Sequence, residues 1–417
     1  MKNRTIKNIL FYSLSRLIFL GPIFFCLVAC IDEFPLSGET TEDMICIDAS
    51  LIKNINTQKV VITRSLSLDW DSIRYVTGCS VYVEDEDGDT RYFTEGKRGI
   101  YLSPIEDSWL IYQRKYRLHV ETKEGGKYIS DYEEILPCPP VDSIYSIEES
   151  SYSKTHGKLM PTLQFYLDIK ANEEFSHYYM WFIEEDWKYQ VPYFYYGFYD
   201  GNSVYWNIDP RTGMPIRVDT LRSCYKHGIV SGIYASSTTN LTINKKKKIP
   251  LVYHFSGDEK VSIKYSILVH QYSLAENAYA YWRQKQAEMQ ESDGMYFTQP
   301  AAVNSNISNV NNENERILGY FWAAATQVKR YVYNQSFGQK SYENCLPDTV
   351  LEIFDVRNWL SMTNDPFSNY IYFPIYFWVT GSPDNPGPIL TSDEKCFDCR
   401  LMGGSLDPPE FWKEDNP

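Results

Sequence analysis

The sequence predicts a mainly β fold, in which an N-terminal sandwich of immunoglobulin or fibronectin type precedes a larger β-rich domain with one clear helix. Composition supports this first: 16% of the 417 residues are aromatic, including 35 Tyr and 10 Trp, and large rings favour strands. Pattern supports it second, because short alternating segments separated by turn residues follow one another along the chain from Met44. Only one segment carries clear helix signals.

The segment 44–137 contains the densest series of strand signals. Asp87-Gly88 lies between two alternating stretches, and an Asp-Gly pair in that position is a strong hairpin signal. Six or seven short strands over ~90 residues, with turns at this spacing, are typical of an immunoglobulin-like or fibronectin-like sandwich. The expected strands are 44–52, 59–66, 79–84, 90–95, 99–102, 115–122 and 127–135.

A proline-rich stretch, Pro137 to Pro140, ends this series and marks a predicted domain boundary, because proline cannot extend a sheet. Residues 138–417 are then expected to form the second, β-rich domain. Its helix is predicted near 273–292, where Ser273 and Glu276 have the spacing of a capping box. The residues expected on one face of this helix are Tyr279, Trp282 and Met289.

Residues 1–29 are predicted to be a lipoprotein signal peptide. They begin with a basic stretch without acids and continue with an apolar run from Leu17 to Ala29, which is shorter than the ~20 residues of a membrane span. The run ends in a small residue followed by Cys30, the arrangement that lipoprotein signal peptidase cleaves. We therefore expect Cys30 to be the acylated N-terminus and residues 30–43 to be a tether.

The charge of the chain excludes one class of partner. The full sequence has 40 Lys and Arg against 54 Asp and Glu. Removal of the signal peptide takes away four basic residues and no acid, which leaves 36 basic against 54 acidic residues and a formal charge of −18. Such an acidic body does not suit nucleic acid, whose binding rewards cations that neutralise phosphates. It also does not suit a body that lies flat on anionic lipid.

Seven of the nine cysteines remain available after loss of Cys26 and acylation of Cys30. An exported location permits disulfides, and an odd number leaves at least one thiol unpaired. Cys396 and Cys399 form one CxxC motif, whereas a zinc ribbon needs two such pairs. The disulfide candidates are Cys224, Cys345, Cys396 and Cys399. Either Cys396 and Cys399 form a local bond with each other, or each of them pairs with one of Cys224 and Cys345. Two further cysteines expected to be buried in strands are Cys46 and Cys79.

Several stretches resemble one family. They are "HQYSLAENAYAYWRQKQ", "GMYFTQPAAVNSNISNVNNENERILGYFWAA", the terminal "KCFDCRLMGGSLDPPEFW", and "VDSI" after the proline hinge. With the signal peptide, they resemble the Bacteroidota lipoproteins of the domain of unknown function 4249 family. One departure is Tyr225 after Cys224, where the family pattern has tryptophan. The resemblance implies an outer-membrane lipoprotein of a kind often associated with TonB-dependent receptors. Asp32-Glu33, directly after the anchor, resemble the surface-export signal of Bacteroidota lipoproteins, so we expect the body to face the cell surface. The family resemblance supplies no activity and no site residues.

The sequence shows no catalytic pattern. Its six histidines have no HExxH spacing, and there is no G-x-S-x-G motif. Asp85, Asp87 and Asp89 alternate around Gly88, as calcium-binding carboxylates do, but a solvated hairpin turn explains them better, because an EF-hand needs a twelve-residue loop between helices. We therefore expect no catalytic residues, no metal ligands and no cofactor.

The aromatic block 175–207 is the most unusual feature of the sequence. Such rings either form stacking platforms for a glycan or peptide ligand, or fill a core as strand residues. Strand alternation buries one face only, so some rings should be exposed unless another element covers them. The candidate ligand-binding residues are Trp181, Trp187, Tyr193, Tyr195, Tyr196 and Trp206.

Three functions are consistent with these observations. The favoured one is a non-enzymatic accessory lipoprotein that holds a ligand or partner for a TonB-dependent transporter. The second is a structural or adhesive surface protein without a small ligand. The third is an envelope hydrolase whose site is assembled from distant strands. An exposed aromatic surface would favour the first, and histidines converging with carboxylates in a deep pocket would favour the third.

Overall fold

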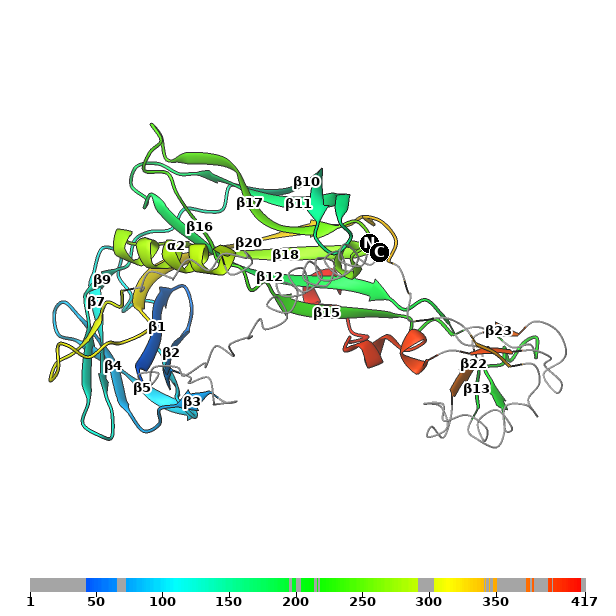
Figure 1. Ribbon diagram of the computed structural model, residues 1–417, viewed down its shortest axis with the longest axis horizontal. Helices are drawn as coiled ribbons and strands as arrows, with labels where there is room; N and C mark the ends of the chain where they lie inside the picture. The colour runs from blue at the N-terminus through cyan, green and yellow to red at the C-terminus, as the bar shows by residue number, and fades with distance from the viewer. Residues whose placement is uncertain are drawn as a thin grey trace, which may run out of the picture. The chain divides into compact units, whose positions relative to one another are not determined.

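The chain folds as a mainly β protein (Figure 1), with 49% of the computed structural model in strands and 10% in helices. All the described strands and helices belong to one compact unit, Met44–Ser65 and Ser72–Pro417. The short strands between 197 and 206 and between 348 and 391 are described by their backbone alone. The described residues are 43–65, 73–194, 197–199, 204–213, 216, 218–291, 304–340, 342, 345, 348–350, 373–375, 377–378, 389–391 and 393–413.

The N-terminal part is a β-sandwich. Its strands follow the order β1-β2-β6-β5 and then β5-β4-β7-β8-β19, so β5 belongs to both halves. Alternate residues of both halves, such as Ile47, Val83 and Leu118, point into one shared core. The strands are β1 (Ile45–Lys53), β2 (Thr57–Arg64), β3 (Arg74–Tyr75), β4 (Ser80–Asp85), β5 (Thr90–Lys97), β6 (Ile100–Pro104), β7 (Lys115–Glu121), β8 (Lys127–Ser130), β9 (Glu133–Glu134) and β19 (Ile307–Asn309).

The β4–β5 hairpin forms at the predicted Asp-Gly turn, where Gly88 has a φ of +87°. The buried carboxylate of Asp85 accepts hydrogen bonds from the backbone N–H groups of Asp87 and Asp89 at 3.1 and 2.9 Å. Arg114 pairs with the same carboxylate at 2.7 Å. The turn therefore uses this acid as an internal acceptor, and the described residues contain no group of three or more side chains arranged to hold a metal ion.

Two strands of the sandwich pair with strands from much later in the chain. β1 pairs in parallel with β20 (Phe321–Tyr333), and β8 pairs with β19. The proline linker also packs on the later part, because Gln271 donates a hydrogen bond to the carbonyl of Pro139 at 2.8 Å. Whether 44–137 folds on its own stays a prediction.

The larger part consists of two facing sheets. The first sheet has the strand order β15-β12-β18-β20 and continues into β1, and β16 also pairs with β12. The second sheet has the order β10-β11-β17. Between them lies a core that includes Trp181, Phe165 and Tyr265, all fully buried. Further strands are β10 (Ser143–Ser153), β11 (Lys158–Lys170), β12 (Tyr178–Gln190), β15 (Ser223–Ile229), β16 (Tyr234–Ser237), β17 (Lys245–Phe255) and β18 (Lys264–Ser273).

Helix α2 (Glu276–Glu291) covers the opposite face of the first sheet. Tyr272, Trp322 and Met180 from the sheet form a separate core with residues of this helix. The predicted capping box is wrong, because Ser273 is the last residue of β18 and the helix begins three residues later. The strand continues through Ser273 because that residue still pairs with Tyr179 and Ala325 on its two neighbours.

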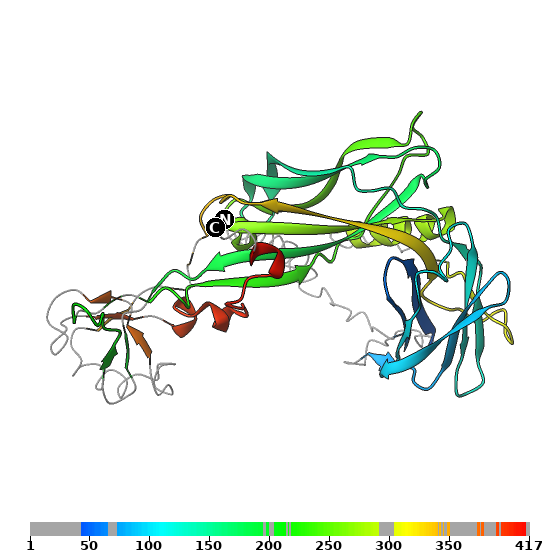
Figure 2. The ribbon, with the colours of Figure 1, turned by 180° about the vertical axis from the view of Figure 1, so that it is seen from behind.

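Strand β20 connects both parts (Figure 2, gold), and its first residues are buried on both faces. Phe321 and Ala323 point into the sandwich core, whereas Trp322 and Ala324 point towards α2. A strand buried on both faces shows no polar alternation. Here the alanines leave room for close packing on each side.

The described C-terminal residues dock on the edge of the first sheet. Ser405 and Tyr225 exchange backbone hydrogen bonds of 2.8 and 2.9 Å, and Trp412 is buried with its ring 5.6 Å from that of Tyr225. The C-terminal elements are η3 (Glu394–Cys396), η4 (Cys399–Met402) and α4 (Glu410–Lys413). A further 3-10 helix, η1 (Glu259–Val261), lies near the same sheet. The remaining short strands are β13 (Gly197–Tyr199), β14 (Val204–Trp206), β21 (Asp348–Val350), β22 (Phe373–Ile375), β23 (Phe377–Trp378) and β24 (Ile389–Thr391).

Candidate functional site

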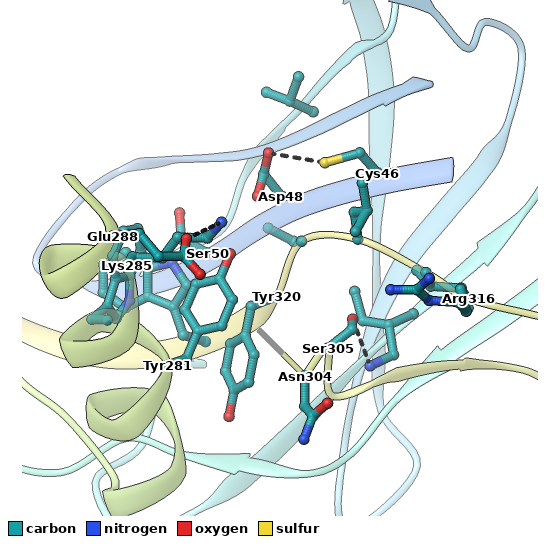
Figure 3. A pocket seen from close by; sticks show the side chains of 18 of the residues that line it. Cys46, Asp48, Ser50, Tyr281, Lys285, Glu288, Asn304, Ser305, Arg316 and Tyr320 are labelled. Carbon is teal, nitrogen blue, oxygen red and sulfur yellow. Dashed lines mark hydrogen bonds and ion pairs between the residues drawn. The ribbon is translucent and has the colours of Figure 1, made fainter. Parts of the chain in front are cut away.

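A cavity of about 910 Å³ lies between the outer face of β1, helix α2 and two loop segments that precede β20. This volume is in the range of small-molecule sites, roughly 300–1,000 Å³. Figure 3 shows the helix side chains on one side of the cavity and Arg316 on the opposite side. The lining residues include Cys46, Asp48, Ser50, Lys59, Tyr281, Trp282, Lys285, Glu288, Asn304, Ser305, Glu315, Arg316, Gly319, Tyr320 and Trp322.

The β1 wall follows from strand alternation. Ile45, Ile47 and Ala49 point into the sandwich core, so the intervening Cys46, Asp48 and Ser50 point outward and line the cavity. On β2, Lys59 and Val61 lie opposite Ser50 and Asp48 and extend this wall. A row of polar residues on an otherwise apolar strand is therefore the local signal of the site.

The helix wall follows from helical spacing. Tyr281, Lys285 and Glu288 are four and three residues apart, so they lie on one face of α2. Lys285 and Glu288 form an ion pair at 3.4 Å. Tyr281 stacks on Tyr320 with 4.5 Å between ring centroids, which joins the helix to the segment directly before β20.

The third wall is held against β1 by backbone hydrogen bonds. Ile47 donates to the carbonyl of Leu318 at 2.9 Å, and Leu318 donates to that of Ile45 at 2.9 Å. Gly319 has a φ of +90°, and a Cβ added there would lie 2.2 Å from the carbonyl oxygen of Ile47. Only glycine allows this approach, so Gly319 holds the loop in the position that closes the cavity.

The carboxylate and thiol on β1 lie close together. The Cys46 thiol contacts Asp48 Oδ2 at 3.6 Å. Burial, together with the neighbouring Asp48, raises the pKa of Cys46 to about 12. Desolvation also raises the pKa of Asp48, against the opposing effects of Cys46 and Lys285. The thiol is therefore protonated at neutral pH. Asp48 accepts one weak hydrogen bond among the described residues, from this thiol.

A buried acid lies behind the cavity wall. Tyr320 donates a hydrogen bond to Glu133 Oε1 at 2.6 Å, and Asn306 donates to the same oxygen at 3.2 Å. Burial raises the pKa of Glu133 to about 7. Oε2 of Glu133 is buried without a partner among the described residues. The position of Tyr320 in the cavity wall thus depends on a carboxyl group that titrates near neutral pH.

The aromatic block does not form the expected binding surface at its two described tryptophans. Trp181 is fully buried and donates to Gln271 at 3.0 Å, and Trp187 is 8% exposed and donates to Glu259 at 3.1 Å. Both rings lie in the core between the two sheets, because the β10-β11-β17 sheet covers their face of β12. The prediction of a stacking platform is wrong for these two residues.

The other aromatic candidates lie at or beyond the end of β12. Tyr193 is half-buried, and its hydroxyl donates a hydrogen bond to the carbonyl of Cys345. The centroid of its ring lies 5.6 Å from that of Phe397. Tyr195 and Tyr196 lie outside the described residues, as does the side chain of Trp206. The cavity thus shares none of its lining with the block, and its own rings come from α2, from Trp322 of β20 and from Tyr320 directly before that strand.

The four disulfide candidates form two bonds, Cys224–Cys399 and Cys345–Cys396. This is the second of the two arrangements open from the sequence, in which each cysteine of the CxxC motif pairs with a distant one. Cys79 and Cys138 are free, and so is Cys46, which lines the cavity. The expectation that Cys46 is a buried core residue is wrong, because it lies on the outer face of β1 and is half-buried.

The anchor residue Cys30, the signal peptide and most of the tether lie outside the described residues. None of the described helices combines the length and the apolar character needed to cross a membrane.

The family model that describes the domain of unknown function 4249 (DUF4249) matches residues 31–330. This match covers well over half of the chain. The chain belongs to the DUF4249 family. Every cavity residue lies inside the region matched by DUF4249, whereas the disulfide partners Cys345, Cys396 and Cys399 lie beyond it. A search of curated proteins found no match.

Proposed function

We propose that this DUF4249 protein is a non-enzymatic lipoprotein of the outer membrane that binds a ligand in the cavity between β1 and α2. In this proposal Cys30 carries the acyl chains, the body faces the cell surface, and the protein serves as an accessory subunit of a TonB-dependent transporter. The signal-peptide pattern and the family resemblance support the location. The cavity of about 910 Å³ carries the binding proposal.

The lining suggests the chemistry of the ligand. Asp48 accepts hydrogen bonds, Lys285 and Arg316 donate them, and Tyr281 and Tyr320 add aromatic surface. Sites of this kind bind molecules that carry both donors and acceptors next to apolar faces. A glycan or a short peptide has these features, whereas a purely apolar ligand would remove water from the charged side chains without offering them hydrogen bonds.

Binding is favoured over catalysis by the state of the one thiol in the described lining of the cavity. A cysteine nucleophile acts as the thiolate, and a thiol with a pKa of about 12 is almost entirely protonated at neutral pH. The described lining also contains no histidine that could serve as its base. These features support a binding protein rather than the hydrolase alternative.

Native mass spectrometry tests the binding proposal. The acylated protein would be purified from its own outer membranes in wild-type form and as Ser50→Trp, which fills the cavity from β1. A matched control is Thr94→Trp, on an exposed position of β5 in the same sandwich. We expect a bound mass on the wild type and on Thr94→Trp that is absent from Ser50→Trp. Equal bound mass on all three, or none on any, would contradict the proposal.

The location and the partner need separate measurements. A Cys30→Ala variant is expected to lose acyl labelling and membrane retention. Quantitative pull-down of the wild-type protein from outer membranes is expected to recover a TonB-dependent transporter in a stoichiometric amount. A protein that is retained and labelled without Cys30, or a pull-down without a transporter, would refute the corresponding part of the proposal.

A further inference from the structure

The hairpin formed by β10 and β11 extends beyond the rest of its sheet. β17 ends at Phe255, opposite Thr162 of β11. Beyond that point the β10–β11 pairing continues for four more residue pairs, from Ser150 and Pro161 to Ser153 and Lys158. Ser256 still donates a backbone hydrogen bond to the carbonyl of Pro161 at 2.9 Å, and the last three pairs have no third strand beside them among the described residues.

The tip of this hairpin combines apolar and basic side chains. Tyr152 and Leu159 are paired across the strands and are 61% and 69% exposed. Lys154, His156 and Lys158 are exposed around them, and the stretch from Ser150 to Met160 contains no acid. In a chain with a formal charge of −14, a stretch of basic residues without acids is unusual.

The turn at the tip is internally hydrogen-bonded. Gly157 donates to the carbonyl of Ser153 at 2.8 Å, and the backbone N–H of His156 donates to Ser153 Oγ at 3.2 Å. His156 Nδ1 lies 3.0 Å from the same hydroxyl. A turn ordered in this way presents its exposed side chains without a large further entropy loss on binding. Neither Lys154 nor Lys158 has an ion pair with any described residue.

We propose that the tip of the β10–β11 hairpin docks on an anionic lipid surface. Tyrosine and leucine favour the boundary between headgroups and acyl chains. Lysine extends its apolar stem along that boundary and places its ammonium group at the phosphates. The acidic remainder of the body is repelled by the same surface, so contact is confined to the tip. This inference depends neither on the cavity nor on acylation of Cys30.

Lysine footprinting on vesicles tests the docking. Full-length protein is incubated with vesicles of phosphatidylcholine alone, or of phosphatidylcholine and phosphatidylglycerol in equal parts. The amines are then acetylated and quantified by mass spectrometry. Lys170 and Lys245, which are exposed and paired at the other end of β11, are internal controls. We expect a several-fold drop in acetylation of Lys154 and Lys158 on the anionic vesicles only, with the controls unchanged.

A pair of variants separates tip docking from other effects. Tyr152→Ser with Leu159→Ser should abolish the protection while both reporter lysines remain. The control Leu241→Ser removes an exposed leucine elsewhere and should leave the protection intact. Circular dichroism would show that each variant is folded. Protection should also decrease as salt is raised.

Three results would overturn the inference. They are equal acetylation of Lys154 and Lys158 on both vesicle types, equal protection of tip and control lysines, and protection that needs added outer-membrane proteins rather than lipid. The third would point to a protein partner instead. Total retention on vesicles reports on the acyl anchor, whereas the ratio of tip to control acetylation reports on the hairpin, so the two failures are distinguishable.

Discussion

The hydroxyl of Tyr320 donates a hydrogen bond of 2.6 Å to the buried carboxyl group of Glu133. The ring of the same tyrosine stacks on Tyr281 of helix α2 at 4.5 Å. Tyr320 thus connects a titratable group inside the protein to the helix that lines the cavity. Changes in the protonation of Glu133 are expected to affect both stability and the shape of the cavity wall.

Glu133 predicts a specific pH dependence of stability. Because its folded pKa of about 7 lies above the ordinary value of 4.5, the native state binds more protons than the unfolded state between these values. The contribution of Glu133, about 3 kcal/mol from a shift of this size, is fully present below pH 4.5 and is lost as the pH rises towards 7. Thermal unfolding of the wild type and of Glu133→Gln between pH 4.5 and 7 should show that the wild type loses stability as the pH rises and that the variant lacks this loss.

The control for this measurement is Glu124→Gln, on an exposed loop position. Subtracting the free energy of unfolding of each variant from that of the wild type removes the common effect of the other carboxylates. If the pH dependence of stability of Glu133→Gln matches that of the wild type as closely as that of Glu124→Gln does, the raised pKa of Glu133 is contradicted.

Gly319 is expected to be intolerant of a side chain for two separable reasons. Its φ of +90° is strained for alanine, and the added Cβ would lie 2.2 Å from the carbonyl oxygen of Ile47. Gly125 has nearly the same φ, +88°, with nothing within 4 Å of an added Cβ. Gly125→Ala should therefore lose only the strain energy, about 1–2 kcal/mol, and Gly319→Ala distinctly more. Equal losses in denaturant unfolding would show that the close approach is unimportant.

The two disulfides predict two linked peptides in a non-reduced digest, one joining Cys224 to Cys399 and one joining Cys345 to Cys396. Each closes a long loop, with sequence separations of 175 and 51 residues. Replacing either pair by alanine should lower the free energy of unfolding by ~2–4 kcal/mol. We expect the larger loss for Cys224 and Cys399, because both are fully buried in the core. A peptide that links Cys396 to Cys399 directly would contradict this pairing.

The segment 44–137 is predicted to fold cooperatively when it is expressed alone. In the whole chain its β1 and β8 strands pair with β20 and β19, and Phe321 and Ala323 of β20 fill part of its core. We therefore expect a fragment in which residues 304–325 are added through a flexible linker to unfold at a higher temperature. Thermal unfolding followed by circular dichroism checks both fragments. No transition in the shorter fragment would refute independent folding, and equal midpoints would refute a contribution from the added strands.

Patterns within a few residues were enough to predict the mainly β fold, the hairpin at Asp87-Gly88 and the helix that ends near Glu291. Alternation, turn chemistry and helical spacing are local properties, so the sequence carries them directly. The same local reasoning placed the start of that helix too early. The additional pairing of Ser273 with neighbouring strands, which no local pattern records, continues β18 up to the helix.

The fate of the aromatic block needed information from outside the block. Alternation indicates that Trp181 and Trp187 share one face of β12, but it does not show that β11 and β17 cover that face. Rings that fill a core and rings that bind a ligand have the same strand pattern, so the sequence left both interpretations open. The covering sheet decided between them for these two tryptophans.

What the sequence determined by itself is therefore the strand content, the turns, the helix and the family to which the chain belongs. The cavity was decided by the tertiary structure alone. Its walls come from residues near 46–61, 281–288 and 304–322, and the parallel pairing of β1 with β20 brings the first of these next to the last. That pairing joins residues more than 250 positions apart, and its stability comes from burial on both faces of β20, which depends on how the whole chain packs rather than on any short segment.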